Sequence, residues 1–156
     1  MLTQLSRLSV EADGRYATAQ ELQFLKDYLQ SLELRVSAYE KIRAAEAEII
    51  YLVEAKKQSL NPNLFKLGSQ DVTEICRRDM VNILRHAAAA LLINDLDHLR
   101  SSLLLWCRTI VHAFKYKSYA EVTYQVLQDV VEQYLTPQEA VLFHPILELN
   151  RIVMTT

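Results

Sequence analysis

The hydrophobic and polar positions of this sequence follow a helical rather than a strand periodicity. Within residues 1–10, Leu2, Leu5 and Leu8 recur at every third position and give a short helix one apolar edge. The pair Asp13-Gly14 then ends this helix, because such residues are typical of turns. The pattern therefore predicts a short N-terminal helix that carries a row of leucines.

A much longer helical pattern follows. Thr18 and Glu21 have the spacing of a capping box, in which a hydroxyl and a carboxylate bond the first free backbone N–H groups of a helix. Leucines at helical spacing continue to about residue 59, and Asn61-Pro62-Asn63 stops the pattern. Because this stretch is longer than an ordinary helix, it predicts two helices with a bend.

The second half of the chain carries the same periodicity in shorter pieces. Helices are predicted over about residues 69–93 and 97–116. Two more capping boxes, Ser118–Glu121 and Thr136–Glu139, are expected to begin the remaining helices. Pro145 lies near the middle of the last helix and is expected to interrupt it.

Composition supports this all-α interpretation. The chain has 2 Gly and 3 Pro, too few for the turns of a β-sandwich or for a Gly-rich nucleotide loop. The net charge of −2 argues against nucleic-acid binding, which usually requires a positively charged surface. No segment approaches the ~20 apolar residues of a membrane span, and two cysteines make no disulfide framework. With neither a repeat nor a linker, residues 1–156 are expected to form one cytosolic domain.

One mid-chain helix carries an unusual group of polar residues. Cys76 and Asp79 lie about 60° apart around the helix axis and share a face with Ile83. Arg78 and Arg85 share a different face. A thiol, an acceptor carboxylate and guanidinium groups could hold a large conjugated ligand that has N–H groups and carboxylates. The simpler interpretation is a buried cysteine beside surface ion pairs.

The two cysteines are expected to differ in reactivity. Arg77 and Arg78 adjoin Cys76 and are expected to favour its thiolate. Cys107 follows Trp106 in an apolar run, so the favoured interpretation is that both pack in the core and that the Cys107 thiol is buried and protonated. Cys76 is therefore expected to be the only covalent attachment site.

Four histidines leave haem binding open as an alternative. His86, His98, His112 and His144 are each a candidate axial ligand. No two of them have the spacing of a helical metal pair, and the HExxH motif is absent. The acidic residues are spread over all helix faces, so no catalytic carboxylate pair stands out. We therefore predict no metal site and no catalytic residue.

The sequence Cys-x-Arg-Asp followed by Leu-Arg, over residues 76–85, resembles the chromophore-bearing helix of phycobiliproteins, the light-harvesting bilin proteins of phycobilisomes. Shorter similarities follow in the same order, at Asp13–Tyr16, Leu25–Tyr28, Arg35–Ala38, Asn94–Leu99 and Leu104–Arg108. The resemblance implies a globin-like fold with two extra N-terminal helices. The short segment before the cysteine and the alanines after Arg85 resemble the divergent phycobiliprotein-like globins linked to bilin biosynthesis.

The resemblance also implies a role for each residue of the cluster. Cys76 would form a thioether to ring A of an open-chain tetrapyrrole, a bilin similar to phycocyanobilin. Asp79 would accept hydrogen bonds from the central pyrrole nitrogens, while Arg78 and Arg85 would hold propionates. Such chemistry tunes a ligand rather than transforming a substrate. The resemblance thus implies a non-enzymatic protein of light harvesting or bilin metabolism.

A second subunit, either a copy of this chain or a homologue, is implied as well. Residues 1–17 would form the pairing extension, in which Asp13 or Arg15 makes an ion pair across the interface. Leucines of the first helix would supply the apolar contact, namely Leu2, Leu5 and Leu8. Tetrapyrrole-pathway enzymes are further expected partners. The implied location is the cytoplasm, at the cytoplasmic face of thylakoid membranes.

Two other functions remain open on the sequence. One is a pigment-free interaction module on the same scaffold that regulates tetrapyrrole biosynthesis or phycobilisome assembly. The other is a haem-binding globin with His86 or His112 as the ligand.

Overall fold

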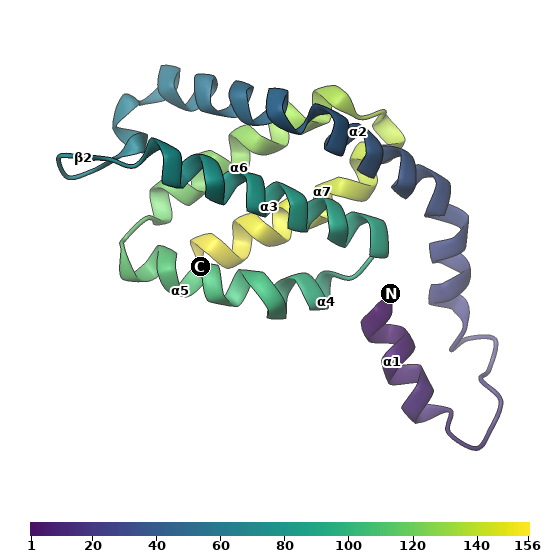
Figure 1. The fold of residues 1–156 in the computed structure, drawn as a ribbon. Helices are drawn as coiled ribbons and strands as arrows, with labels where there is room; N and C mark the ends of the chain where they lie inside the picture. Colours follow the sequence, from purple (N-terminus) through teal and green to yellow (C-terminus); the bar gives the residue numbers. More distant parts are fainter.

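The computed structural model describes residues 1–156 and shows a chain that is helical along nearly all of its length (Figure 1). The main helices are α1 (Leu2–Glu11), α2 (Gln23–Leu60), α3 (Thr73–Ile93), α5 (Leu105–Ala113), α6 (Lys117–Val131) and α7 (Pro137–Thr155). Shorter helical pieces are η1 (Pro62–Phe65), α4 (Leu96–Leu99), η2 (Arg100–Leu104) and η3 (Glu132–Tyr134). Two short strands, β1 (Lys66–Leu67) and β2 (Gln70–Asp71), form an antiparallel hairpin. The expected all-α fold is confirmed.

The long helix α2 runs unbroken over 38 residues, so the prediction of two separate helices is wrong. Figure 1 shows that α2 nevertheless changes direction before it reaches the helical body. Its sequence contains neither Gly nor Pro, so it can curve without losing its backbone ladder. The capping box before it does form, with Thr18 donating its backbone N–H to Glu21 at 2.7 Å and Glu21 donating its own to the Thr18 hydroxyl at 3.2 Å.

Two predicted boundaries differ from the structure. Helix α3 begins at Thr73 rather than near residue 69, because the residues before it form the hairpin, in which Gly68 has a φ of +62°. The single helix expected over 97–116 is instead three consecutive pieces, of which the middle one, η2, is a π-helical turn. Such turns widen a helix locally by one extra residue.

The capping predictions for the last two helices have different outcomes. The Ser118–Glu121 box is wrong, because α6 has already begun at Lys117 and the Glu121 carboxylate accepts from Arg151 at 2.9 Å. The Thr136–Glu139 box is confirmed, with both of its reciprocal hydrogen bonds present. Pro145 does not interrupt α7, because the packing of its neighbours Ile146 and Leu147 in the core outweighs the backbone hydrogen bond that a proline cannot donate.

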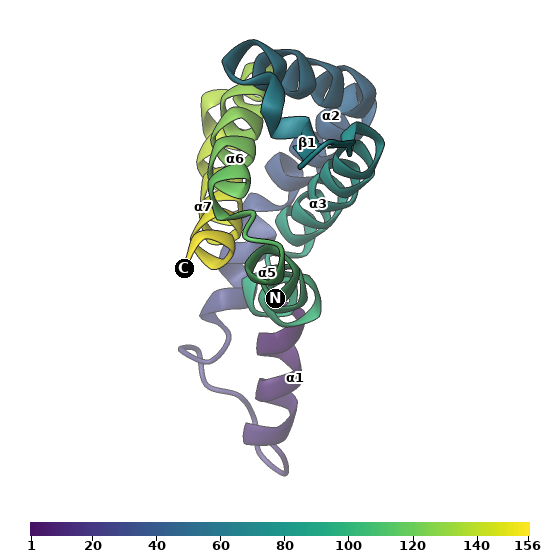
Figure 2. The ribbon, with the colours of Figure 1, turned by 90° about the vertical axis from the view of Figure 1, so that its left-hand side faces the viewer.

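One apolar core joins the long helices. Helix α2 packs against α3 and α6, and α7 packs against α3 and α6. Figure 2 shows α6 and α7 on one side of the body, α2 and α3 on the other, and α1 projecting beyond it. No residue of α1 is buried. The N-terminal helix therefore contributes nothing to the core.

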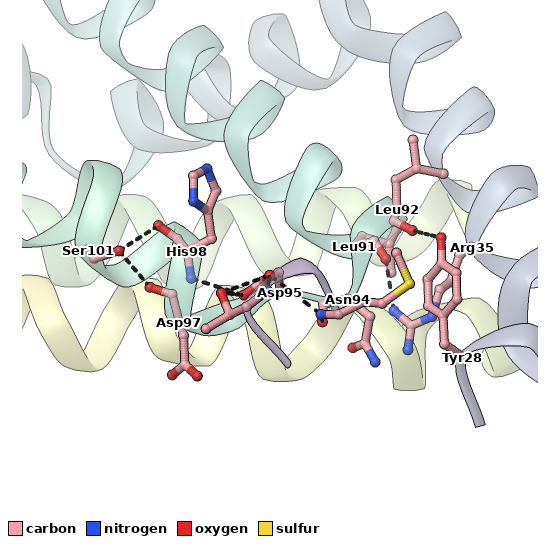
Figure 3. Close-up of polar contacts among 11 residues, drawn as sticks. Tyr28, Arg35, Leu91, Leu92, Asn94, Asp95, Asp97, His98 and Ser101 are labelled. Atoms are coloured by element: carbon pink, nitrogen blue, oxygen red, sulfur yellow. Dashed lines mark hydrogen bonds and ion pairs between the residues drawn. The ribbon is translucent and has the colours of Figure 1, made fainter. Parts of the chain in front are cut away.

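Helix α3 ends in a turn with many polar contacts, here called the α3–α4 corner (residues 91–98; Figure 3). Two residues of α2 donate hydrogen bonds to the end of α3. Arg35 Nη1 donates to the Leu91 carbonyl at 2.8 Å, and the Tyr28 hydroxyl donates to the Leu92 carbonyl at 3.0 Å. Asn94 takes a left-handed conformation, with φ of 49°, and ends the helix. The buried Asp95 carboxylate then accepts from the backbone N–H of Thr3 at 2.7 Å and of His98 at 3.1 Å.

Candidate functional site

A cavity of about 440 Å³ lies beside the N-terminal half of α3. Its wall also includes residues of α2, the hairpin, η2, α5 and α6. Of its 23 lining residues, 17 are hydrophobic, which makes it an apolar site with a few polar groups. This volume and this composition are typical of sites for small organic ligands.

The cavity has an aromatic rim and a buried floor. Trp106 and Phe114, which are 65% and 55% exposed, stand at its mouth. The ring of Tyr116 stacks against Phe114 with centroids 6.0 Å apart. Met80 and Met154 also line the cavity and are almost fully buried. A flat conjugated molecule could therefore enter between aromatic rings and reach an apolar floor.

The structure brings together three of the four residues predicted to bind a cofactor. Cys76, Arg78 and Asp79 all line the cavity, and Arg78 Nη2 lies 3.2 Å from an oxygen of Asp79. Arg85 does not join them. It lies between α3 and α2 and holds the Glu46 carboxylate through two hydrogen bonds of 2.6 and 2.7 Å.

The expectation that Cys76 favours its thiolate is wrong. Burial raises the pKa of the Cys76 thiol; the nearby Lys57 ammonium works against this shift and the Asp79 carboxylate adds to it. The arginines that were expected to lower the pKa are neutralised elsewhere. Arg77 binds Glu54 at 2.8 Å, and Arg78 is paired with Asp79. The Cys76 thiol therefore keeps its proton unless a base removes it.

The core interpretation is wrong for Trp106, whereas Cys107 does pack against the edge of the core. Trp106 is mostly exposed, and Cys107 is only half-buried and lines the same cavity as Cys76. Burial, with a further contribution from Asp79, raises the pKa of the Cys107 thiol and so favours the protonated state that was expected. The cavity thus has two protonated thiols rather than one.

Sequence reasoning missed two features of the site. The aromatic group Phe114, Tyr116 and Tyr119 lies where α5 passes into α6, and no periodicity marks it. Lys57 also lines the cavity and is only 2% exposed. Its position could have revealed it, because it follows the buried Val53 by four residues, on the apolar face of α2.

The histidines offer no axial ligand to this cavity. His86, His98, His112 and His144 are all exposed, and none of them lines it. His86 Nδ1 instead lies 3.1 Å from the backbone carbonyl oxygen of Asn82. No group of three or more potential metal-ligating side chains is present. The haem interpretation therefore has no support from the geometry.

The predicted interface residues lie apart from the cavity. Leu2 is 52% exposed, and Leu5 and Leu8 are half-buried. Arg15 was expected to make an ion pair across a subunit interface, but it binds Glu21 of its own chain at 2.7 and 3.0 Å. Asp13 is exposed.

The structure is thus an all-α body with an apolar cavity against a cysteine-bearing helix. Comparison with known families matches residues 8–151 to the phycobilisome protein family. The chain belongs to this family and has its globin-like helical fold. Proteins of phycobilisomes carry covalently bound bilins, assemble with other subunits and serve light harvesting rather than catalysis. No curated protein matches the chain. None of its helices is both long and apolar enough to cross a bilayer.

Proposed function

We propose that this protein is a non-enzymatic member of the phycobilisome family that binds a bilin in the cavity beside α3. The observation that carries the proposal is that Cys76 and Asp79 line a mostly apolar cavity of about 440 Å³. The family membership gives the ligand class, and the aromatic rim suits a flat conjugated molecule. The role is in light harvesting or in bilin metabolism.

Attachment would proceed by addition of the Cys76 thiol to a double bond on ring A. The sulfur bonds to one carbon and the proton ends on the other, so no oxidant and no leaving group are required. The raised pKa of the Cys76 thiol makes this step slow without a base. We therefore expect reversible binding first and thioether formation second.

Asp79 and Arg78 would act on the bound bilin. Asp79 offers carboxylate oxygens to the pyrrole N–H groups, and its negative charge favours the protonated chromophore. Arg78 is exposed at the mouth, where it can leave Asp79 and bind a propionate. Arg85 would take no part in binding the bilin, because it does not line the cavity and Glu46 holds its guanidinium.

The test is production of the chain together with bilin-synthesising enzymes, followed by zinc-enhanced fluorescence of the denatured band. The wild type should carry pigment through denaturation, Cys76→Ala should carry none, and the matched control Cys107→Ala should behave as the wild type. Pigment retained in Cys76→Ala and lost in Cys107→Ala would show that Cys107 on α5 is the attachment site. A colourless wild type, both before and after denaturation, would favour the pigment-free module.

Subunit pairing through residues 1–17 is part of the same proposal, with a copy of this chain or a homologue as partner and tetrapyrrole-pathway enzymes as further partners. It is supported by α1 itself, because a ten-residue helix is stable only when its apolar edge is covered, and no residue of α1 is buried. In sedimentation, the wild type should associate with rising concentration, and Leu5→Glu should remain monomeric. Equal monomeric behaviour of both would refute self-association.

A further inference from the structure

We propose that Lys57 is a specificity-determining residue of the cavity, whose ammonium group binds a carboxylate of the ligand. The cavity would then prefer an elongated apolar molecule with a free acid to the same molecule as a neutral ester. This inference rests on the proposed bilin binding and deepens it, because a bilin carries two propionates.

The first support is the position of Lys57 in the fold. It lies on α2 four residues after Val53 and eight after Ile49, both of which are fully buried. The lysine therefore continues the core-facing stripe of the helix into the cavity wall, where it is 2% exposed. A lysine is almost never buried to this extent without a charged partner.

The second support is that the ammonium forms no ion pair with a carboxylate of the protein, since Glu54 is bound to Arg77. Lys57 Nζ lies 4.9 Å from the ring centroid of Phe65 and makes no hydrogen bond or ion pair. A cation over an aromatic face recovers only part of its lost hydration. Burial accordingly lowers the pKa of Lys57, while the nearby Cys76 and Glu54 partly oppose this shift. An anion that enters the cavity would therefore stabilise this charge.

The third support is that the arginines of this region are already occupied. Arg77 is held by Glu54 and Glu74, and Arg78 by Asp79. Arg85 is held by Glu46, away from the cavity. Lys57 is thus the cation of the cavity wall that a ligand carboxylate can bind without displacing a protein carboxylate.

The experiment measures binding of two probes to the purified full chain. Trp106 is the only tryptophan and stands at the cavity rim, so quenching of its fluorescence reports occupation. The probes are biliverdin and its dimethyl ester, which differ in the two carboxylates. We expect the wild type to bind the free acid about tenfold more tightly than the ester. Lys57→Met should bind both with the affinity that the wild type has for the ester.

Lys56→Met is the matched control, because Lys56 is the exposed neighbour on the same helix and its loss should leave the preference unchanged. Circular dichroism checks that each variant folds. A wild type that binds acid and ester equally, or a Lys57→Met variant that keeps the preference, overturns the role of Lys57 while bilin binding stands. If neither probe binds the wild type, bilin binding fails and the role of Lys57 fails with it.

Discussion

The two halves of α3 contact very different surroundings. Cys76 and Ile83, in the first half, line a cavity of about 440 Å³. Ala87, Ala88 and Leu91, in the second half, are buried in the closely packed core. The helix is continuous, so its backbone geometry does not produce the difference.

Side-chain size accounts for much of this contrast. Small side chains allow neighbouring helices to approach, and the buried alanines of the second half do this. Larger residues such as Ile83 and Trp106 line the cavity instead, and they leave space beside the first half of the helix. The polar groups differ as well. At the α3–α4 corner, Arg35 and Asp95 have hydrogen-bond partners, while the Lys57 ammonium at the cavity has none. One helix thus serves stability at one end and binding at the other.

Truncating one apolar side chain in each half of α3 should give the largest difference in stability between the two halves. Leu91→Ala removes a fully buried side chain from the close-packed half and should lower the free energy of unfolding by about 2–5 kcal/mol. Ile83→Ala should cost only about 1 kcal/mol, because its side chain already borders open space and truncation creates little new cavity. Urea unfolding measures both. Equal losses would mean that the cavity closes in solution.

Removing the acceptor at the corner should have the next largest effect. Asp95→Ala leaves the N–H groups of Thr3 and His98 and the Thr3 hydroxyl without their acceptor, so the free energy of unfolding should fall by about 2 kcal/mol. Asp97→Ala is the matched control on the same turn, because its exposed side chain makes no hydrogen bond, and it should change little.

The loss in Asp95→Ala should also depend on pH. Burial alone would raise the pKa of Asp95, but the hydrogen bonds from Thr3 and His98 outweigh it and hold the pKa below its ordinary value. The contribution of this carboxylate is therefore complete above about pH 4, the ordinary range, and is lost as the pH falls through the folded value. Urea unfolding at descending pH should show the gap between wild type and variant narrowing. A gap that widens would contradict this assignment.

Adding bulk to the alanine run should have the smallest effect of the three. Ala87→Leu forces extra carbons into a fully buried position and should cost about 1–2 kcal/mol of stability. Ala89→Leu, an exposed position two residues further along, should stay within about 0.5 kcal/mol of the wild type. Thermal unfolding compares the two variants directly. Similar melting temperatures would mean that α3 and the helix packed against its alanines can move apart without loss of stability.

Much of the fold could be predicted from the sequence because it depends on local signals. The helices around Leu5 and after Pro137 begin and end near residues whose conformational preferences act over a few positions. The π-helical turn at Arg100–Leu104 and the start of α6 could not be predicted in this way. They are set by how α5 and α6 meet α7, and contacts between distant helices leave no local signal.

The site was predictable only where its residues share one helix. Cys76 and Asp79 are three positions apart, so helical geometry places them on one wall. Trp106 and Cys107 adjoin each other within an apolar run, and nothing in that run distinguishes a core from a cavity wall. Lys57 lies on a different helix, and only the packing of α2 against α3 brings it to the same site.

The capping of α3 by α2 has a consequence for the order of folding. The last carbonyls of an isolated helix have no partner within it, and here Arg35 and Tyr28 supply the donors for Leu91 and Leu92 from 56 and 64 residues away. The end of α3 is therefore complete only after a long loop has closed, a slow step compared with the growth of a helix. The cavity half of α3 has no such requirement and can form early. The helix that carries the proposed binding residues would thus be largely helical before the corner that ends it is in place.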